Sequence, residues 1–293
     1  MVNYSIKDLE RLSGIKAHTI RIWEKRHGLL KPSRTRTNIR YYGDDDLKKI
    51  LNISLLNKRG IKISHLSRLS NKEIAEKVMM IVKDPTDYET IIDQLIISVI
   101  DLNEKKFNDN FSKGILQSGF ENTIIKIIFP LLDKIGTLWM TGSINPAQEH
   151  FISNLIRQKL IVAIDRLNVE PHRDRKRFLL FLPEGELHEM GLLFYNYLIR
   201  KRGHEVIYFG QSVPLMDLAE ASGVLQYDYL LTSIISIYNG KELVDYLYQL
   251  VSTFPQKSIY VTGNQVMKLS QSVPDKIKKI DSLDHFIRFL EGK

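Results

Sequence analysis

The 293-residue sequence contains no cysteine. Disulfide bonds, thiolate metal sites and a cysteine nucleophile are therefore excluded. The first residues, MVNYSIKDLERLSG, are polar and contain no apolar signal core, and no apolar run approaches the length needed to cross a bilayer. With 43% hydrophobic and 26% charged residues, the composition is that of a globular chain of two or three domains. We expect a cytoplasmic protein that makes no use of a membrane.

Excess positive charge is absent outside the first quarter of the chain. Residues 1–70 hold 16 Lys and Arg against six Asp and Glu, whereas the remaining residues hold 26 against 28. The net charge of +8 therefore comes from the first quarter alone. A solvated basic surface would give the same count, but such a concentration favours a small module that faces a polyanion.

The first 70 residues have the pattern of a winged helix-turn-helix. SIKDLERLSG predicts a helix with a serine cap and a terminal glycine, and KAHTIRIWEKRHG predicts a second, basic helix. In KPSRTRTNIRYY, arginines are interleaved with small polar residues, which is typical of a β-hairpin wing that lies on phosphates. The acids of GDDDL begin a further helix, where the helix dipole favours them.

This segment resembles the MerR family of transcriptional regulators in YSIKDLERLSGI, TIRIWEKRHGLL, the pair Arg40-x-Tyr42 and the acids before Leu47. The resemblance implies a dimer on a palindromic site in double-stranded DNA, contacted by the second helix and the wing. The candidate DNA contacts are Lys16, His18, Thr19, Arg21, Lys25, Arg34, Arg36, Arg40 and Tyr42. Each of them could instead be a solvated surface residue.

Residues 71–167 are nearly free of strand signals. YETIIDQLIISVIDLNEKKF, FENTIIKIIFPLLDKIGTLW and EHFISNLIRQKLIVAIDRL each place apolar residues at helical spacing. With a shorter helix around residues 71–82 they predict a four-helix bundle, with turns at Pro85 and Gly119. The segment WMTGSINPAQEH joins Trp139 to Glu149 and His150, and the residues alone leave open whether its role is structural.

After PHRDRKR, the short apolar segments RFLLFLP, HEVIYFG, YDYLLTSIIS and KSIYVTG alternate with helical segments, and KIKKI and LDHFIRFLEG form a last pair. This alternation predicts a five-stranded, doubly wound parallel sheet of the Rossmann-like, flavodoxin-like type. The expected chain is multidomain α and α/β, with a winged-helix domain at residues 1–72, a four-helix bundle at 73–168 and the Rossmann-like domain at 176–293.

His188 follows the first of these strands, at the edge where doubly wound sheets bind ligands. A lone histidine at the start of a helix is often a cap or a surface residue. Zinc needs companion ligands, and none lies within the local spacing. A hydrolytic triad is disfavoured because no nucleophile-elbow motif is present. A metal that brings most of its own ligands, as in a corrin ring, would need only one histidine.

The segment ELHEMG, residues 186–191, resembles the Asp-x-His-x-x-Gly motif of cobalamin-binding domains of the base-off, His-on type. Ser233 follows after 41 residues, where Ser-x-Leu belongs, and Gly263-Asn264 stands at the Gly-Gly position. The resemblance implies that His188 is the lower axial cobalt ligand, that Glu186 orients it, and that the nucleotide tail passes Gly191, Ser233 and Gly263. Glu186 stands where the motif has Asp and keeps the carboxylate, and Ile235 stands where the motif has Leu and keeps the side-chain volume. Asn264 stands where the motif has its second Gly and adds a side chain beside the nucleotide tail.

The order of the three domains resembles the CarH/LitR group of photoreceptor regulators. That resemblance implies adenosylcobalamin as a light-sensitive cofactor, a repressor bound to DNA in the dark and released in light, and a dark tetramer. Nine residues separate Trp139 from Glu149, as in the group's Trp-x9-Glu-His motif. The motif implies that Trp139 packs on the adenosyl group, that Glu149 hydrogen-bonds it, and that His150 binds cobalt after photolysis.

Two other functions remain open at this point. A MerR-type regulator that has lost the cofactor and responds to a partner protein would explain Asn264. A subunit of a cobalamin enzyme is the third possibility, although no room remains for the barrel of roughly 250 residues that usually accompanies such a domain. We therefore expect a regulator and not an enzyme.

Overall fold

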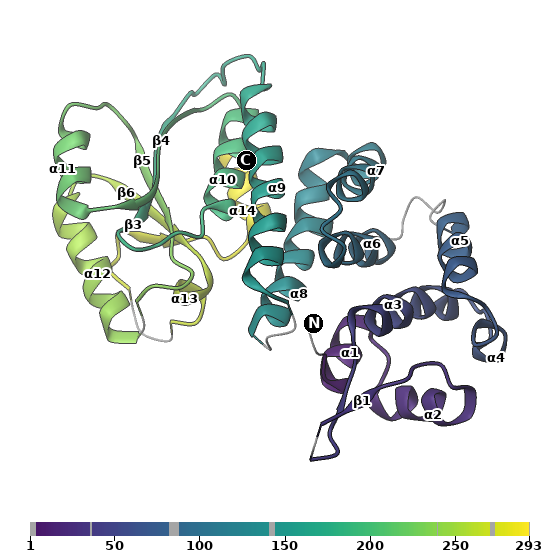
Figure 1. Ribbon diagram of the computed structural model, residues 1–293. Helices are drawn as coiled ribbons and strands as arrows, with labels where there is room; N and C mark the ends of the chain where they lie inside the picture. The colour runs from purple at the N-terminus through teal and green to yellow at the C-terminus, as the bar shows by residue number, and fades with distance from the viewer. Residues whose placement is uncertain are drawn as a thin grey trace. The chain divides into compact units, whose positions relative to one another are not determined.

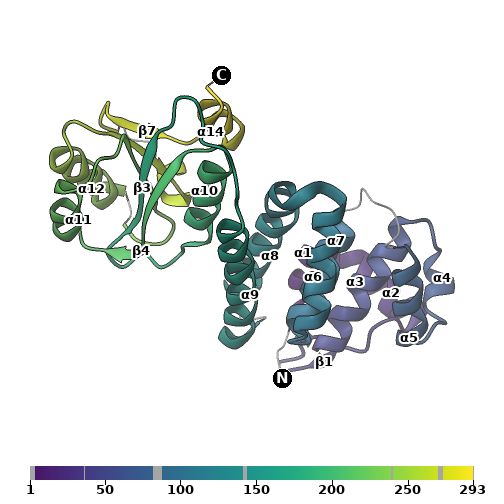
Figure 2. The same ribbon diagram turned by 90° about the horizontal axis from the view of Figure 1, so that it is seen from above.

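The computed structural model describes residues 4–35, 37–81, 88–140, 144–238, 240–269 and 273–292 (Figures 1 and 2). Its internal contacts divide the chain into two compact units, Met1–Leu155 and Ile156–Lys293. The boundary falls within one helix, α9 (Pro146–Asp165). Each unit has its own buried core and is described by itself.

The first unit begins with the predicted winged helix-turn-helix. Helices α1 (Ile6–Ser13) and α2 (Ala17–His27) precede the two-stranded wing, β1 (Ser33–Arg34) and β2 (Arg40–Tyr41), and α3 (Asp44–Lys58) follows. Ser5 and Asp8 form a reciprocal capping box at the start of α1. Gly14 and Gly28 end the two helices in the left-handed conformation, with φ of 71° and 59°. Local sequence signals therefore set these boundaries.

The helical region differs from the expected bundle in two places. Helix α5 (Asn71–Ile81), which follows the short α4 (Ile63–Leu66), packs against α3 and not within the bundle. The first expected long helix is split into α6 (Tyr88–Ile100) and α7 (Glu104–Thr123), because Leu102 has φ 49° and Asn103 caps α7. Pro85 lies outside the described residues. The expected turn at Gly119 is confirmed, since its φ of 77° and ψ of 165° break α7.

After Gly119 the chain continues through a π-helical turn, η1 (Ile124–Ile128), into α8 (Phe129–Met140) and then α9. Among the described residues, one stretch, Glu104–Gly136, is long and apolar enough by composition to span a membrane, with 28% of its most apolar window buried. The stretch reaches that length only across the break at Gly119. A core helix of a globular protein passes the same test, so the stretch alone assigns no membrane segment.

A row of polar contacts joins the winged-helix domain to the bundle within the first unit. Lys58 of α3 lies 2.5 Å from Glu89 of α6, and the Gln94 amide donates to Asn52 at 3.4 Å. At the far end, Lys48 lies 2.5 Å from Asp101, just beyond α6. Residue numbers fall along α3 as they rise along α6, so the two helices run antiparallel.

The second unit contains the predicted five-stranded parallel sheet, in the order β4-β3-β5-β6-β7. Its strands are β3 (Arg177–Pro183), β4 (Glu205–Val213), β5 (Tyr229–Ser233), β6 (Ser258–Thr262) and β7 (Ile277–Lys279). Helices α11 (Leu215–Gly223) and α12 (Gly240–Thr253) cover one face, with the short α13 (Asn264–Met267), and α10 (Met190–Lys201) and α14 (Leu283–Leu290) cover the other (Figures 1 and 2). The prediction of a doubly wound sheet is confirmed.

The alternation of side chains along β3 builds both layers of the core. Leu179 and Phe181 belong to the buried cluster with α11 and α12. Phe178 points to the opposite face, where its ring contacts Phe286 and Phe289 of α14. Because both faces are covered, the strand is buried from Phe178 to Pro183, and this burial fixes the position at which the chain leaves the sheet.

Candidate functional site

The candidate site begins where β3 leaves the sheet. β3 pairs with β4 on one side and with β5 on the other, so the strand order reverses at β3. The loops after β3 and β5 diverge at this point, which is where doubly wound sheets bind ligands. Glu186 and His188 stand in the loop after β3, and residues 234–238 form the loop after β5.

Glu186 connects these two loops. Its side chain is fully buried, and its Oε2 accepts hydrogen bonds from the backbone N–H groups of Ile235 and Ser236, both at 2.8 Å. The Ser236 hydroxyl donates to Oε1 at 3.1 Å, as does the backbone N–H of His188. Burial by itself would raise the pKa of Glu186, but the hydrogen bonds from His188, Ser236 and Ile235 outweigh it and hold the pKa well below its usual range. Glu186 is therefore an anion at neutral pH.

The carboxylate of Glu186 fixes the orientation of the His188 ring. Nδ1 of His188 lies 2.6 Å from Oε1 of Glu186, and an ionised carboxylate can only accept, so Nδ1 carries the proton. The other ring nitrogen, Nε2, then has the lone pair that a metal requires. The side chain is 56% exposed, so the ring reaches the surface of the unit.

The donor set fits a metal that brings its own ligands. Among the described residues, no group of three or more His, Asp or Glu side chains is arranged to hold a metal ion. One oriented imidazole would suffice for cobalt in a corrin ring, whose equatorial positions are already filled. The residues present therefore fit a corrinoid better than a bare ion.

The other residues expected near the nucleotide tail lie close to this edge. A Cβ on Gly191 would meet no atom within 4 Å, so the space beside it is open. Ser233 ends β5 and is buried. Gly263 has φ 105°, and a Cβ there would lie 2.3 Å from the backbone oxygen of Ile234, so the fold itself requires this glycine. Asn264 is exposed at the start of α13.

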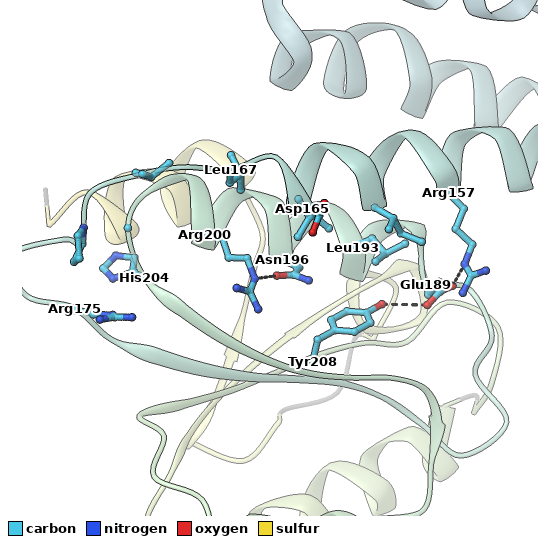
Figure 3. Close-up of a pocket in the computed structure, with 15 residues that line it drawn as sticks. Arg157, Asp165, Leu167, Arg175, Glu189, Leu193, Asn196, Arg200, His204 and Tyr208 are labelled. Carbon is cyan, nitrogen blue, oxygen red and sulfur yellow. Dashed lines mark hydrogen bonds and ion pairs between the residues drawn. The ribbon is translucent and has the colours of Figure 1, made fainter.

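Glu189 is a functional candidate that sequence reasoning missed. It is 6% exposed, and its carboxylate accepts from the Tyr208 hydroxyl at 3.1 Å and pairs with the Arg157 guanidinium (Figure 3). Burial and the charge of Glu189 both raise the pKa of Tyr208. Glu189 thus fixes the backbone directly after His188 to β4 and to the second half of α9. It stands at a variable position of the motif, so no pattern marked it.

Trp139, Glu149 and His150 belong to the first unit. Trp139, in the last turn of α8, is 55% exposed, so it is not a core residue. Glu149 lies 2.8 Å from Nδ1 of His150 and accepts from the Ser153 hydroxyl at 2.5 Å. The His150 side chain is 74% exposed. Trp139 and His150 are therefore exposed at the surface of that unit, and Glu149 is partly exposed.

The expected DNA contacts divide into two groups. Lys16, His18, Arg21, Lys25 and Arg34 are exposed, and Thr19 is half-buried on the same helix. Arg36 lies outside the described residues.

Tyr42 corrects the expectation, because its side chain is fully buried and its hydroxyl donates to Glu24. The backbone of Tyr42 pairs with that of Tyr4, which directs the ring into the domain. Arg40 lies 3.3 Å from the same Glu24, and its side chain remains 36% exposed.

Comparison with known proteins finds one family match on the winged helix-turn-helix and a second on helices α6 to α9. Residues 4–73 match the family model of the MerR HTH family regulatory protein, and residues 91–163 match that of the B12 binding domain. The chain thus combines a MerR-type DNA-binding domain with a B12-binding domain.

Two relatives are similar to this chain over most of its length. Over 282 residues, 94% of this chain and 93% of the relative, it is 26% identical to the HTH-type transcriptional repressor CarH of Myxococcus xanthus. It is 25% identical to the repressor CarA of the same organism, over 83% of this chain and 80% of that one. The monomethylamine corrinoid protein of Methanosarcina barkeri shares the fold, with a TM-score of 0.50 and 13% identity over 71% of this chain and 100% of that one.

Replacing Glu186 by Gln tests the buried anion. The variant keeps the volume but weakens the hydrogen bonds from Ile235, Ser236 and His188, so the free energy of unfolding at pH 7 should fall by about 1.5–3 kcal/mol. Because the folded pKa is lowered, this stabilisation is present above the unfolded value of about 4.3 and is lost as pH falls through the folded pKa. The difference between variant and wild type, measured by urea unfolding, should therefore shrink in acid.

Glu184→Gln is the matched control, since Glu184 is exposed in the same loop. It should unfold like the wild type at both pH values. Equal stability of the Glu186 variant and the wild type at pH 7 would contradict the role assigned to this carboxylate.

Proposed function

We propose that this protein is a B12-binding transcriptional regulator and not an enzyme, and that its effector is adenosylcobalamin read out by light. The observation that carries the proposal is the Glu186–His188 pair at the switch point of the sheet. Support comes from the MerR HTH and B12 binding family models and from the similarity to two transcriptional repressors. We infer a repressor that is bound to DNA in the dark and released on illumination.

Bound adenosylcobalamin would supply a cobalt–carbon bond that light breaks. We assign His188 to hold the metal through Nε2, while Glu186 retains the Nδ1 proton and prevents the ring from turning. We assign the tail slot to Gly191, Ser233 and Gly263. In the first unit, we assign Trp139 and Glu149 to hold the adenosyl group, and His150 to ligate the opposite face of the metal after illumination.

The chain offers a path from this site to DNA. His150 is the fifth residue of α9, and Arg157, two turns later on the same helix, pairs with Glu189 beside His188. Ligation by His150 would pull on this helix, and a rigid helix passes such a force to its neighbours as a hinge or shear movement. The polar row between α6 and α3 would carry it to the helix-turn-helix. We propose that this movement separates subunits of a dark tetramer on a palindromic operator in the cytoplasm.

A regulator without the cofactor is the second candidate. Asn264 favours it, because it replaces the second glycine of the family motif and is exposed beside Gly263. An absorption spectrum of the protein mixed with adenosylcobalamin in the dark and passed over a sizing column separates the two functions, because only the first predicts retained cofactor.

His188→Ala should reduce cobalamin retention at least tenfold, because it removes the protein ligand to the metal. Retention is measured as the ratio of cofactor absorbance to protein after gel filtration in the dark. His285→Ala is the control, since His285 is exposed on α14 far along the chain from the motif. A His188 variant that keeps the full complement of cofactor would refute the ligand assignment.

DNA binding should depend steeply on salt, because neutralised phosphates release counterions. Arg21→Ala and Arg34→Ala should each weaken binding and reduce the slope of log affinity against log salt by about one for each phosphate that is no longer neutralised. Tyr42→Phe should leave DNA affinity unchanged while lowering stability by about 1 kcal/mol, because its hydroxyl serves only the buried bond to Glu24. Electrophoretic mobility shift at several salt concentrations measures the DNA affinity of each variant, and thermal unfolding measures the stability of the Tyr42 variant. Salt-independent binding would count against this surface.

Illumination of the cofactor-loaded wild type should abolish DNA binding and give the absorption spectrum of cobalt held by two imidazoles. His150→Ala should lose the cobalt–carbon bond in light but lack that spectrum, because the second imidazole is missing. His65→Ala, at an exposed position of α4, should behave as the wild type. If illuminated and dark wild type have the same DNA affinity and the same size by light scattering, the light response is wrong and a light-independent regulator remains.

A further inference from the structure

A cavity of about 630 Å³ lies in the second unit, and Glu189, but not His188, is one of its lining residues. The last turns of α9 and the connector to β3 form one side, and α10 and β4 form the other (Figure 3). Its volume falls in the range of small-molecule sites, roughly 300–1,000 Å³. The first side is largely apolar, with Ile161, Ile164 and Val169, whereas the second presents Asn196, Arg200 and Tyr208.

Arg200 brings to this cavity a positive charge that no acid neutralises. Its Nε donates to the Asn196 side-chain oxygen at 2.7 Å and its Nη2 donates to the backbone oxygen of Val206 at 2.8 Å, and both acceptors are neutral. Within the part of the chain that the structure describes, no carboxylate comes within ion-pair distance of Arg200. Burial lowers the pKa of Arg200, as expected for a cation withdrawn from water without a counter-ion.

Two of the nearby carboxylates are already engaged. Glu189 serves Arg157 and Tyr208, and Glu205, which acts on Arg200 only at longer range, pairs with Arg175 and Arg177. A third carboxylate, Asp165, lines the cavity but makes no ion pair with Arg200, so Arg200 has no carboxylate partner among the described residues.

Asn196 supplies a second donor at the same place. It is 5% exposed, and its oxygen is occupied by Arg200. Its amide nitrogen donates to no residue in the described ranges and is not enclosed, so it can donate to a group bound in the cavity. In Figure 3, Asn196 and Arg200 lie next to each other along α10 on the same side of the cavity. A charged and a neutral donor side by side are suited to one carboxylate.

We propose that this cavity binds a small organic monocarboxylate with an apolar body. The carboxylate would accept from Arg200 and Asn196, and the apolar body would cover Ile161 and Val169, which are 43% and 42% exposed. Asp165 also lines the cavity and adds a negative charge, which disfavours a doubly charged phosphate. Such a ligand ties the connector after α9 to α10, whether or not cobalamin is bound.

Benzoate is the probe, titrated into the full-length protein without cobalamin or DNA and followed by ligand-observed NMR. We expect saturable binding in the millimolar range or tighter, and at least about tenfold weaker binding of benzamide, which has the same shape without the charge. Inorganic phosphate is titrated in parallel. Absence of saturable benzoate binding would overturn the proposal, and phosphate binding tighter than benzoate would overturn the assignment to a monocarboxylate.

Two variants locate the binding. Arg200→Gln removes the charge, and Asn196→Asp places a carboxylate beside Arg200, so each should weaken benzoate binding about tenfold or more. Asn196→Asp is also expected to fold normally, because it supplies the missing counter-charge from within. Arg166→Gln, at an exposed position between lining residues, should bind benzoate as the wild type does. If both test variants, folded by circular dichroism, bind as the wild type does, the site is wrong.

Discussion

The candidate site depends on one buried charge, the carboxylate of Glu186. A carboxylate withdrawn from water is stable only when other groups replace its hydration, and here backbone N–H groups of Ile235 and Ser236 and the His188 ring do so. The same bonds close the gap between the loops after β3 and β5. One carboxylate therefore both anchors the two loops, through Oε2, and orients the imidazole, through Oε1.

A second buried carboxylate stands on the other side of His188. Glu186 controls the ring, whereas Glu189 holds the backbone that follows, through Tyr208 of β4 and Arg157 of α9. His188 is thus an exposed side chain between two immobilised neighbours, which is how an accessible ligand is kept in place. The contact with Arg157 also ties the backbone of the site to the second half of α9.

Local patterns predicted most of the fold. The apolar run of β3 ended where the strand ends, and glycines at 14, 28 and 119 marked real breaks, because each adopts a conformation that other residues avoid. The predictions failed where packing between segments, and not local sequence, decides the structure. Nothing local places α5 on α3, and the break after Ile100 depends on the conformation of Leu102, a residue without a turn signature.

The sequence by itself determined the elements, the concentration of positive charge and the spacing of the Glu186–His188 motif, since these depend on neighbours in the chain. Only the tertiary structure decided which charges are buried and what compensates them. It directed Tyr42 and Arg40 toward Glu24, recruited Glu189 from a variable motif position, and left Arg200 without an ion-pair partner in its cavity. Partners for a buried charge come from segments distant in sequence, so no local pattern can reveal them.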